Sequence, residues 1–296
     1  MMAAAVARHN FGRDHLNGPA ELVIFLEPDV LRHRRRLETW GREPLTLRPT
    51  IDGRETAAWL AGADGCPDGF LVAFVRPMGD EVRLRLMPFA DLACADEMPA
   101  VIAVDMPIGL PDRIGPGGRG PEQAVRPLLG ARQSSVFAVP SRAAVYTPDY
   151  REACRIAATT SDPPRQVSKQ LFMIAPKIRE VDACLRADLG LRDRVFEVHP
   201  EVAFWRLNGN RALDEPKKVR GRPHAAGLAL RRKLLIAAGL PAAVAGATPP
   251  RGSGPDDLLD ALACAVIARR IHGGEAVCFP PVPGQDSWGL RMAIWA

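Results

Sequence analysis

The sequence predicts an α/β protein: a mixed five-stranded sheet flanked by helices, with a helical and loop insertion between the fourth and fifth strands. Three observations predict this class. Short apolar runs of strand length, separated by Gly and Pro turns, dominate the first half of the regular region. Apolar residues at helical spacing dominate the second half. With 47% apolar and 25% charged residues in 296, the chain has the composition and length of a soluble globular protein with a sizeable core.

The strands are predicted in chain order. Residues 59–63 read as a buried strand, and residues 70–75 follow it at the spacing of an antiparallel hairpin. Residues 82–86 alternate apolar and basic side chains, which predicts a third strand with one solvated face. The continuous apolar run at 100–105 predicts a fourth strand that is buried on both faces. Residues 194–198 are the predicted fifth strand.

Four helices are predicted. Residues 89–97 favour a short helix, and residues 168–189 a long one that Pro176 is expected to kink. Residues 225–238 are typical of an amphipathic helix with Arg231 on its polar side. Residues 256–271 have acids in the first turn and glycines after the last, which are helix start and stop signals.

The order of these elements is the ribonuclease H-like order, in which three antiparallel strands precede strands joined by crossovers. We therefore expect a ribonuclease H-like domain at 57–296, with an insertion or lid at 106–193. Residues 1–56 contain a basic cluster and helix breakers, and are predicted to be an N-terminal extension that is poorly ordered or outside the fold. A functional basic arm is the alternative for this segment.

Charge and cysteine content restrict the partners and the compartment. A net charge of +5 permits binding of a polyanion without requiring it, and a GC-rich genome explains the excess of arginine at least as well as phosphate recognition. The six scattered cysteines form no C-x-x-C pair, which predicts reduced thiols. Without a membrane-length apolar stretch or a signal-peptide pattern, we expect a cytoplasmic protein and no membrane partner. The oligomeric state is not predicted.

Five acidic residues stand where a catalytic metal site needs them. Asp64 and Asp105 each end an apolar run, Glu197 interrupts another, and Asp257 and Asp260 lie one turn apart on one helix face. Carboxylates beside a core are costly unless a metal or a partner compensates them. Rigid strand ends and a crossing helix are suitable positions for the oxygen ligands of Mg²⁺ or Mn²⁺. We therefore predict that all five are catalytic and metal-binding residues.

Most of these acids also have a structural explanation. Aspartates often cap turns after strands, which would account for Asp64 and Asp105. An ion pair with one of the many arginines would account for Glu197. The helix macrodipole favours acids in a first turn, which explains Asp256 and Asp257 without a metal.

Asp260 is harder to explain structurally, because apolar or small residues surround it. Ala261, Cys264 and Ala268 share its side of the helix, and small side chains there would let the helix lie close to the sheet. That close approach would bring the acids of the helix within coordination reach of the strand acids.

Six further residues are predicted to bind substrate: Lys177, His199, Glu201, Lys217, Lys218 and Arg231. The basic members, together with Arg220, would contact a phosphate backbone. His199 and Glu201 directly follow Glu197, which places them beside the predicted site. The alternatives are a turn histidine at His199 and ion pairs from Lys177 and Arg179 to acids three residues on.

Six motifs resemble the bacterial family catalogued as domain of unknown function 429: residues 62–66, 103–111, 134–137, 176–182, 196–201 and 256–261. Residues 286–294 are similar to a closing Asp…Gly-Leu-Arg pattern. The resemblance implies what that family is described as, namely predicted nucleases of ribonuclease H-like fold. The run from Asp257 to Asp260 is also similar to the last helix of Holliday-junction resolvases, where such acids bind metal. The chain departs from the family in having Glu122, followed by Pro127, where an aspartate is expected after Arg119.

Together these features predict a divalent-metal-dependent nuclease that hydrolyses phosphodiester bonds in DNA or RNA with Mg²⁺ or Mn²⁺ as cofactor. Two alternatives remain open. A nucleotide-binding phosphotransferase or ATPase of related fold would repeat the fold with glycine-rich phosphate hairpins, and the chain shows no second copy of its first-strand motif. A non-catalytic binding protein would use the acids only as caps and ion pairs.

Overall fold

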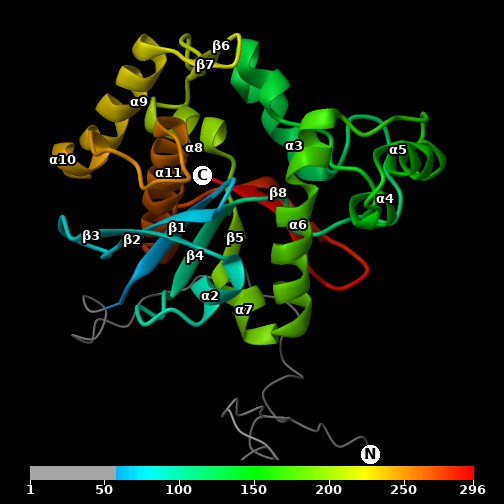
Figure 1. Ribbon diagram of the computed structural model, residues 1–296, viewed down its shortest axis with the longest axis horizontal. Coiled ribbons are helices and arrows are strands. Elements are labelled where there is room, and N and C mark those ends of the chain that lie inside the picture. The colour runs from blue at the N-terminus through cyan, green and yellow to red at the C-terminus, as the bar shows by residue number, and fades with distance from the viewer. Residues whose placement is uncertain (1–57) are drawn as a thin grey trace, which may run out of the picture. The chain divides into compact units, whose positions relative to one another are not determined.

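The structure is a computed structural model that describes residues 58–296, so the prediction for residues 1–56 lies outside the described residues. Its centre is a mixed sheet of seven strands in the order β3-β2-β1-β4-β5-β9-β8 (Figure 1). The strands are β1 (Leu60–Cys66), β2 (Gly69–Val75), β3 (Val82–Met87), β4 (Val101–Asp105), β5 (Val195–Glu197), β8 (Cys278–Gln285) and β9 (Arg291–Trp295). The prediction of five strands was wrong in number, because the two C-terminal strands were not recognised.

The strand directions place several strand ends at one edge. β2 and β3 run antiparallel to their neighbours, as the hairpin spacing predicted. β1, β4, β5 and β9 are parallel to one another, and β8 runs antiparallel to β9. The carboxyl ends of the four parallel strands therefore lie at the same edge of the sheet.

A helical insertion joins β4 to β5, as predicted. It consists of α3 (Gly120–Val125), the 3₁₀ helix η3 (Arg126–Ser135), α4 (Arg142–Tyr146), α5 (Tyr150–Thr159), α6 (Lys169–Ala187) and α7 (Leu189–Arg194). Outside it lie α2 (Phe89–Ala93), α8 (Pro200–Leu207), α9 (Ala225–Ala237), α10 (Ala242–Ala245), α11 (Pro255–His272) and the hairpin of β6 (Lys218–Val219) and β7 (Arg222–Pro223). None of the helices in residues 58–296 has the length and apolarity needed to cross a membrane.

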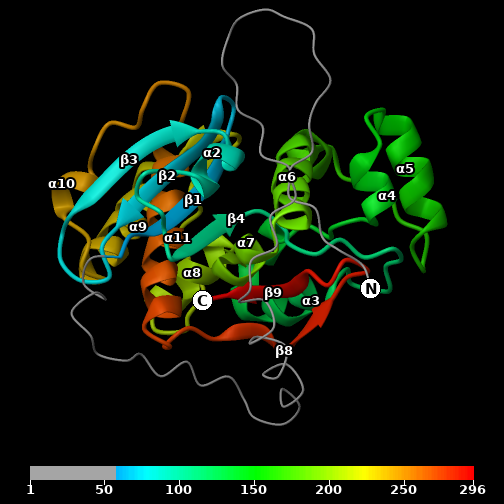
Figure 2. The same ribbon diagram turned by 90° about the horizontal axis from the view of Figure 1, so that it is seen from below.

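Helices cover both faces of the sheet, because strand residues alternate between two cores. Ala61 and Ile102 belong to a core shared with α2, α4, α5 and α6. Leu60 and Ala103 belong to a second core shared with α8, α9 and α11. Figures 1 and 2 both show α4 and α5 grouped near α6, and α9 and α10 grouped near α11.

Helix α11 lies directly on β1, and a glycine permits this. A Cβ atom on Gly62 would overlap the backbone of Ala261 and Ala265, so only glycine allows so close an approach. The prediction that small residues let this helix lie close to the sheet is confirmed, with Ala265 taking part in the contact. The acids in the first turns of α11 are therefore brought beside the end of β1.

Candidate active site

Asp64 and Asp105 lie side by side on one face of the sheet. They are direct partners in the parallel pairing of β1 with β4, so their side chains point to the same side. Because strand residues alternate, this is the side of Gly62, which faces α11. The charge of each carboxyl group is therefore felt by its neighbours in the site. Burial and the charge of Asp105 raise the pKa of Asp64 well above its usual range.

Asp260 approaches this pair from α11. Its side chain is buried, and Lys217 Nζ donates a hydrogen bond to its Oδ2 atom. Burial raises the pKa of Asp260 to about 7, with Lys217 acting against the shift and Asp105 contributing to it. Burial likewise raises the pKa of Asp105. We refer to Asp64, Asp105 and Asp260 as the carboxylate centre.

Glu201 adjoins the carboxylate centre from the first turn of α8, and its charge acts on both Asp105 and Asp260. Its Oε1 atom is ion-paired with Arg231 Nη2, and both side chains are buried. The prediction that Arg231 lies on the polar side of its helix is wrong. Arg231 shares the buried stripe of α9 with Leu228 and Leu235, where it cannot contact a substrate backbone directly.

The two lysines at the β6–β7 hairpin each pair with an acid of α11. Lys217 is ion-paired with Asp260, and Lys218 Nζ lies 2.6 Å from Asp256 Oδ2. Asp256 is thus buried and paired with Lys218. The sequence had explained Asp256 only as an acid favoured at a helix start, so this ion pair was not predicted. Of the predicted substrate-binding lysines in this hairpin, Lys217 reaches the carboxylate centre and Lys218 lies beside it.

Glu197 lies at the same edge as the carboxylate centre but points to the opposite face. Its partner in the parallel pairing with β4 is Val104, so its side chain shares the side of Val104 rather than that of Asp105. There its Oε2 atom accepts a hydrogen bond from the Ile108 backbone N–H at 2.8 Å, and its Oε1 atom one from Arg119 Nη2 at 2.6 Å. The ion-pair explanation of Glu197 is therefore confirmed, and both its oxygens are occupied.

Arg119, which was not among the predicted site residues, organises this second group of acids. Its Nε atom donates to Glu122 Oε1 at 2.7 Å, and its Nη1 atom donates to the carbonyls of Ile108 and Gly109. Glu122 Oε2 accepts the Arg119 backbone N–H and so caps α3. Glu122, which stands where the family was expected to have an aspartate, thus has two roles: it caps this helix and pairs with Arg119. Burial raises the pKa of Glu197 to about 7, and Arg119 opposes this shift.

Asp257 differs from Asp260 although both belong to the first turns of α11. Its Oδ2 atom accepts the backbone N–H of Gly254 at 2.7 Å, which is a helix-capping contact. Burial raises its pKa, and its charge acts on Asp64. Asp257 is therefore near the carboxylate centre, but it is engaged at the helix start.

His199 and Lys177 both lie near the carboxylate centre. His199 Nδ1 accepts the Glu201 backbone N–H at 3.2 Å, which leaves Nε2 to donate to the Ser135 carbonyl at 3.3 Å. Both ring nitrogens of His199 therefore have hydrogen-bond partners, as expected if His199 is a structural turn histidine rather than a substrate-binding residue. A Cβ on Gly65 would lie 2.8 Å from Lys177 Cδ, so the Lys177 stem passes over the residue next to Asp64.

The predicted ion pairs within α6 do not form in the described part of the chain. Glu180 accepts the Phe89 backbone N–H at 2.6 Å, and Arg179 donates to the Val145 carbonyl at 2.9 Å. Lys177 Nζ instead lies 5.1 Å from the centroid of the Phe70 ring. The ammonium of Lys177 is consequently without an acidic partner among residues 58–296.

The carboxylate centre opens into a cavity of about 280 Å³. Its polar side is lined by Asp64, Asp105, Glu201 and Lys217, and also by His199 and by the group of Arg119, Glu122 and Glu197. The other side is apolar and comes from the insertion, chiefly from Phe137, Val139, Leu171 and Ile174. The cavity therefore combines buried charge with an apolar wall, which is the usual character of a small-molecule or substrate site.

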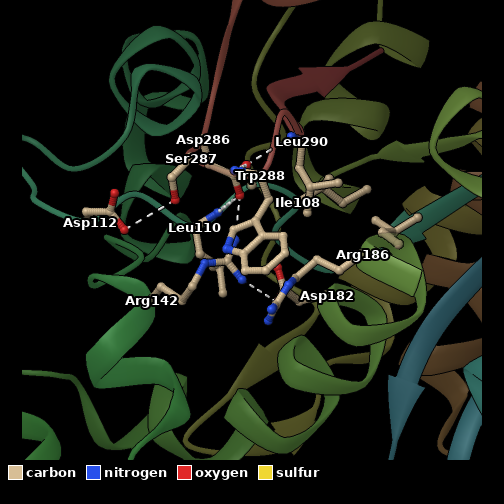
Figure 3. A network of polar contacts seen from close by, with 12 residues as sticks. Ile108, Leu110, Asp112, Arg142, Asp182, Arg186, Asp286, Ser287, Trp288 and Leu290 are labelled. Carbon is tan, nitrogen blue, oxygen red and sulfur yellow. Dashed lines mark hydrogen bonds and ion pairs between the residues drawn. The ribbon is translucent and has the colours of Figure 1, made fainter. Parts of the chain in front are cut away.

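A further acidic motif residue is structural. Asp286 Oδ2 accepts hydrogen bonds from the Leu110 backbone N–H and from Arg142 Nη2, at 2.9 and 2.6 Å (Figure 3). Its Oδ1 atom accepts the backbone N–H groups of Trp288 and Leu290, both at 2.9 Å. The closing motif thus ties the turn before β9 to the segment after β4 and to α4.

The donors of the carboxylate centre suit a hard divalent cation, although the centre is not a complete metal site. No group of three or more His, Cys, Asp or Glu side chains in residues 58–296 is placed so that it could hold a metal ion. Lys217 occupies part of the space between the acids, and Arg231 holds one oxygen of Glu201. Asp260 Oδ1 and Glu201 Oε2 are nevertheless buried without a hydrogen-bond partner, and such oxygens are ligands that Mg²⁺ or Mn²⁺ can satisfy.

The fold and the buried acids define an α/β protein with a carboxylate-lined cavity at the carboxyl edge of a mixed sheet. The chain belongs to the family described as protein of unknown function DUF429, whose model matches residues 62–285. The comparisons found no match among curated proteins and none among solved structures.

Proposed function

We propose that the protein is a divalent-metal-dependent phosphodiesterase that acts on DNA or RNA, with the ribonuclease H-like arrangement of catalytic acids. Its metal ligands would be Asp64, Asp105 and Asp260. The observation that carries this proposal is the approach of buried Asp260, from α11, to Asp64 and Asp105, which lie side by side on β1 and β4 and line a cavity. Such a group of acids costs stability unless a cation offsets it.

Mg²⁺ or Mn²⁺, when bound, would supply positive charge to the attacking water and to the phosphate oxygens. The chain itself supplies rigidity. Asp64 and Asp105 are fixed by adjacent strands, and Asp260 by a helix that packs on the backbone of β1. His199 caps α8 and so holds Glu201 beside them. Glu197 and Arg119 fix the segment after β4 from the other face.

Two features favour a nucleic-acid substrate. Lys177 offers an ammonium without an acidic partner among the described residues, next to the end of β1. The apolar wall around Phe137 and Ile174 could contact a nucleobase while the acids face its phosphate. The net charge of +5 is compatible with a polyanion.

The proposal is tested by incubating the purified protein with single-stranded, duplex and branched DNA and RNA in Mg²⁺ or Mn²⁺. We expect cleavage of at least one substrate, and its loss in Asp105→Asn. Asp188→Asn is the matched control, because Asp188 only caps the start of α7. Failure of the metal-replete protein to cleave any substrate, or full activity of Asp105→Asn, would contradict the proposal. Absence of Mn²⁺ binding as well would favour the non-catalytic alternative.

A further inference from the structure

The cavity at the carboxylate centre is the first of three that adjoin one another. Phe137 and Val139 line both this cavity and a middle cavity of about 360 Å³ in the insertion. Gln166 lines both the middle cavity and an outer cavity of about 360 Å³ beside α5. We call this row of cavities, from Phe137 through Gln166 to Tyr150, the insertion groove. It leads from the carboxylate centre outward across the insertion.

Aromatic and basic side chains are interleaved along the insertion groove. Phe137 forms the wall between the first two cavities, and Arg165 lines the middle one. Tyr150 and Arg151 line the outer cavity. Bases of a single strand stack on aromatic rings while cationic side chains follow its backbone, and every base has a face that can stack. The groove therefore has the side chains that bind single-stranded nucleic acid of any sequence.

The arginines of the groove have charge to offer a ligand. Arg151 and Arg165 are exposed, and neither forms an ion pair within residues 58–296. Burial lowers the pKa of Arg126, Glu122 opposes this shift and the charge of Arg165 adds to it, so the guanidinium groups of Arg126 and Arg165 lie near each other. An anion bound at this point would relieve their repulsion.

The positive charge of the chain is concentrated in this region. Residues 106–169, from the end of β4 to the first residue of α6, contain nine basic and five acidic residues. Most of the net charge of +5 therefore comes from the part of the chain that forms the groove. A polyanion is the partner that this distribution favours.

The segment that carries Arg165 is held in place by hydrogen bonds. Ser161 Oγ accepts the Arg165 backbone N–H at 2.7 Å. The Ile114 N–H donates to the Thr160 carbonyl, and the Asp162 N–H donates to the Ile114 carbonyl, both at 2.9 Å. Ile114 also lines the middle cavity, so the backbone beneath Arg165 is part of the cavity wall.

We propose that the insertion groove binds single-stranded nucleic acid, with a base stacked on Phe137 and with phosphates at Arg165 and Arg151. The inference rests on the proposed phosphodiesterase function, and it identifies the substrate as a single strand rather than a duplex. Cavities of about 280 and 360 Å³ lie near the lower end of the range for small-molecule sites, which suits single nucleotides better than paired ones.

The test measures binding of a fluorescein-labelled oligothymidine of about twelve nucleotides, a length within the usual site size, by fluorescence anisotropy in EDTA. Neither cleavage nor a metal enters this measurement. We expect Arg165→Gln and Arg151→Gln each to weaken binding at least about threefold. Each should also reduce the slope of log affinity against log salt concentration by about 0.7, the value for one phosphate contact on a single strand.

Two further variants complete the test. Phe137→Leu keeps an apolar side chain in the wall but removes the ring, and should weaken binding at least about fivefold through loss of stacking. Lys233→Gln is the matched control, because Lys233 is an exposed cation on α9, which packs on the other face of the sheet. Its affinity and its salt slope should equal those of the wild type.

Absence of single-strand binding, unchanged affinity in Arg165→Gln and Arg151→Gln, or an equal loss in Lys233→Gln would overturn the groove as a binding site. Tighter binding of a duplex of the same length would overturn its preference for a single strand. Failure of the proposed function is distinguishable from these results. If the wild type binds and the variants weaken binding as expected, but no substrate is cleaved with Mg²⁺ or Mn²⁺, the phosphodiesterase proposal fails and the groove stands.

Discussion

Two groups of acids lie at the carboxyl edge of the sheet, on opposite faces, and they differ in how their charge is balanced. On one face, Glu197 and Glu122 share Arg119, and both oxygens of Glu197 accept hydrogen bonds. On the other face, Lys217 is the one ion-pair partner of the carboxylate centre among residues 58–296, and Asp260 keeps a buried oxygen without a hydrogen-bond partner there. The first group is complete and stabilises the fold. The second is incomplete, which is the property expected of a site that receives a cation.

Removal of Arg119 tests the complete group and should have the largest effect on stability. Arg119→Met leaves two buried carboxylates without their partner, and should lower the free energy of unfolding by about 3–5 kcal/mol. Urea unfolding of the variant measures this change. Arg155→Met is the control, because Arg155 and Glu152 form an exposed pair that solvent screens and that should contribute little to stability. An equal loss of unfolding free energy in the two variants would show that the buried group around Arg119 stabilises the fold no more than an exposed ion pair does.

Removal of one acid from the carboxylate centre should have the opposite effect on the metal-free protein. Asp105→Asn relieves the mutual repulsion of buried acids, so the metal-free variant should melt at a higher temperature than the wild type. If the protein is the proposed nuclease, the activity of this variant should fall at least about 100-fold, more than the loss typical of residues that only support a metal ligand. A variant that is both less stable and fully active would show that Asp105 is structural.

The pH dependence of stability sharpens the comparison further. Because burial raises the pKa of Asp260 from 3.8 to about 7, the folded protein binds this proton more tightly than the unfolded chain does. Its contribution to stability is therefore complete below about pH 4 and is lost as the pH rises to about 7.

In metal-free protein the melting temperature of the wild type should fall relative to that of Asp260→Asn across this range. Excess Mn²⁺ should reverse the trend, because it binds the deprotonated acids. An identical pH dependence of both proteins would contradict this explanation.

The smallest effect is expected at Asp257. Asp257→Ala removes the acceptor for the Gly254 N–H, and should cost about 0.5–2 kcal/mol of stability. Because this carboxylate is engaged in capping α11, we expect the proposed nuclease activity to fall less than about tenfold. Loss of activity as severe as in Asp260→Ala would assign Asp257 to the carboxylate centre.

Local patterns in the sequence were sufficient to predict the first five strands, the insertion and the position of α11. β8 could not be recognised, because the Pro-rich segment from Phe279 to Pro283 resembles a loop. Proline lacks a donor for the ladder and is tolerated in an edge strand such as this one. The extra length of β1 beyond Asp64 was hidden by the glycines around the turn, which are not typical of a strand.

Two features of the site could not be read from strand ends or charge runs alone. Glu197 was grouped with Asp64 and Asp105 because all three stand near strand ends, but the facing direction depends on register, which a three-residue strand does not reveal. Arg231 was assigned to the solvated face because two basic residues follow it. Its spacing of three from Leu228 and four from Leu235 indicates the buried stripe, and this signal was present in the sequence.

The most direct test of the account is Mn²⁺ binding to the wild type, Asp64→Asn and Asp105→Asn, measured by calorimetry on folded protein. The account predicts binding to the wild type and an affinity at least about tenfold lower in each variant, since each removes one of the proposed ligands. Absence of binding to the wild type, or equal affinity in all three proteins, would contradict a metal site at the carboxylate centre.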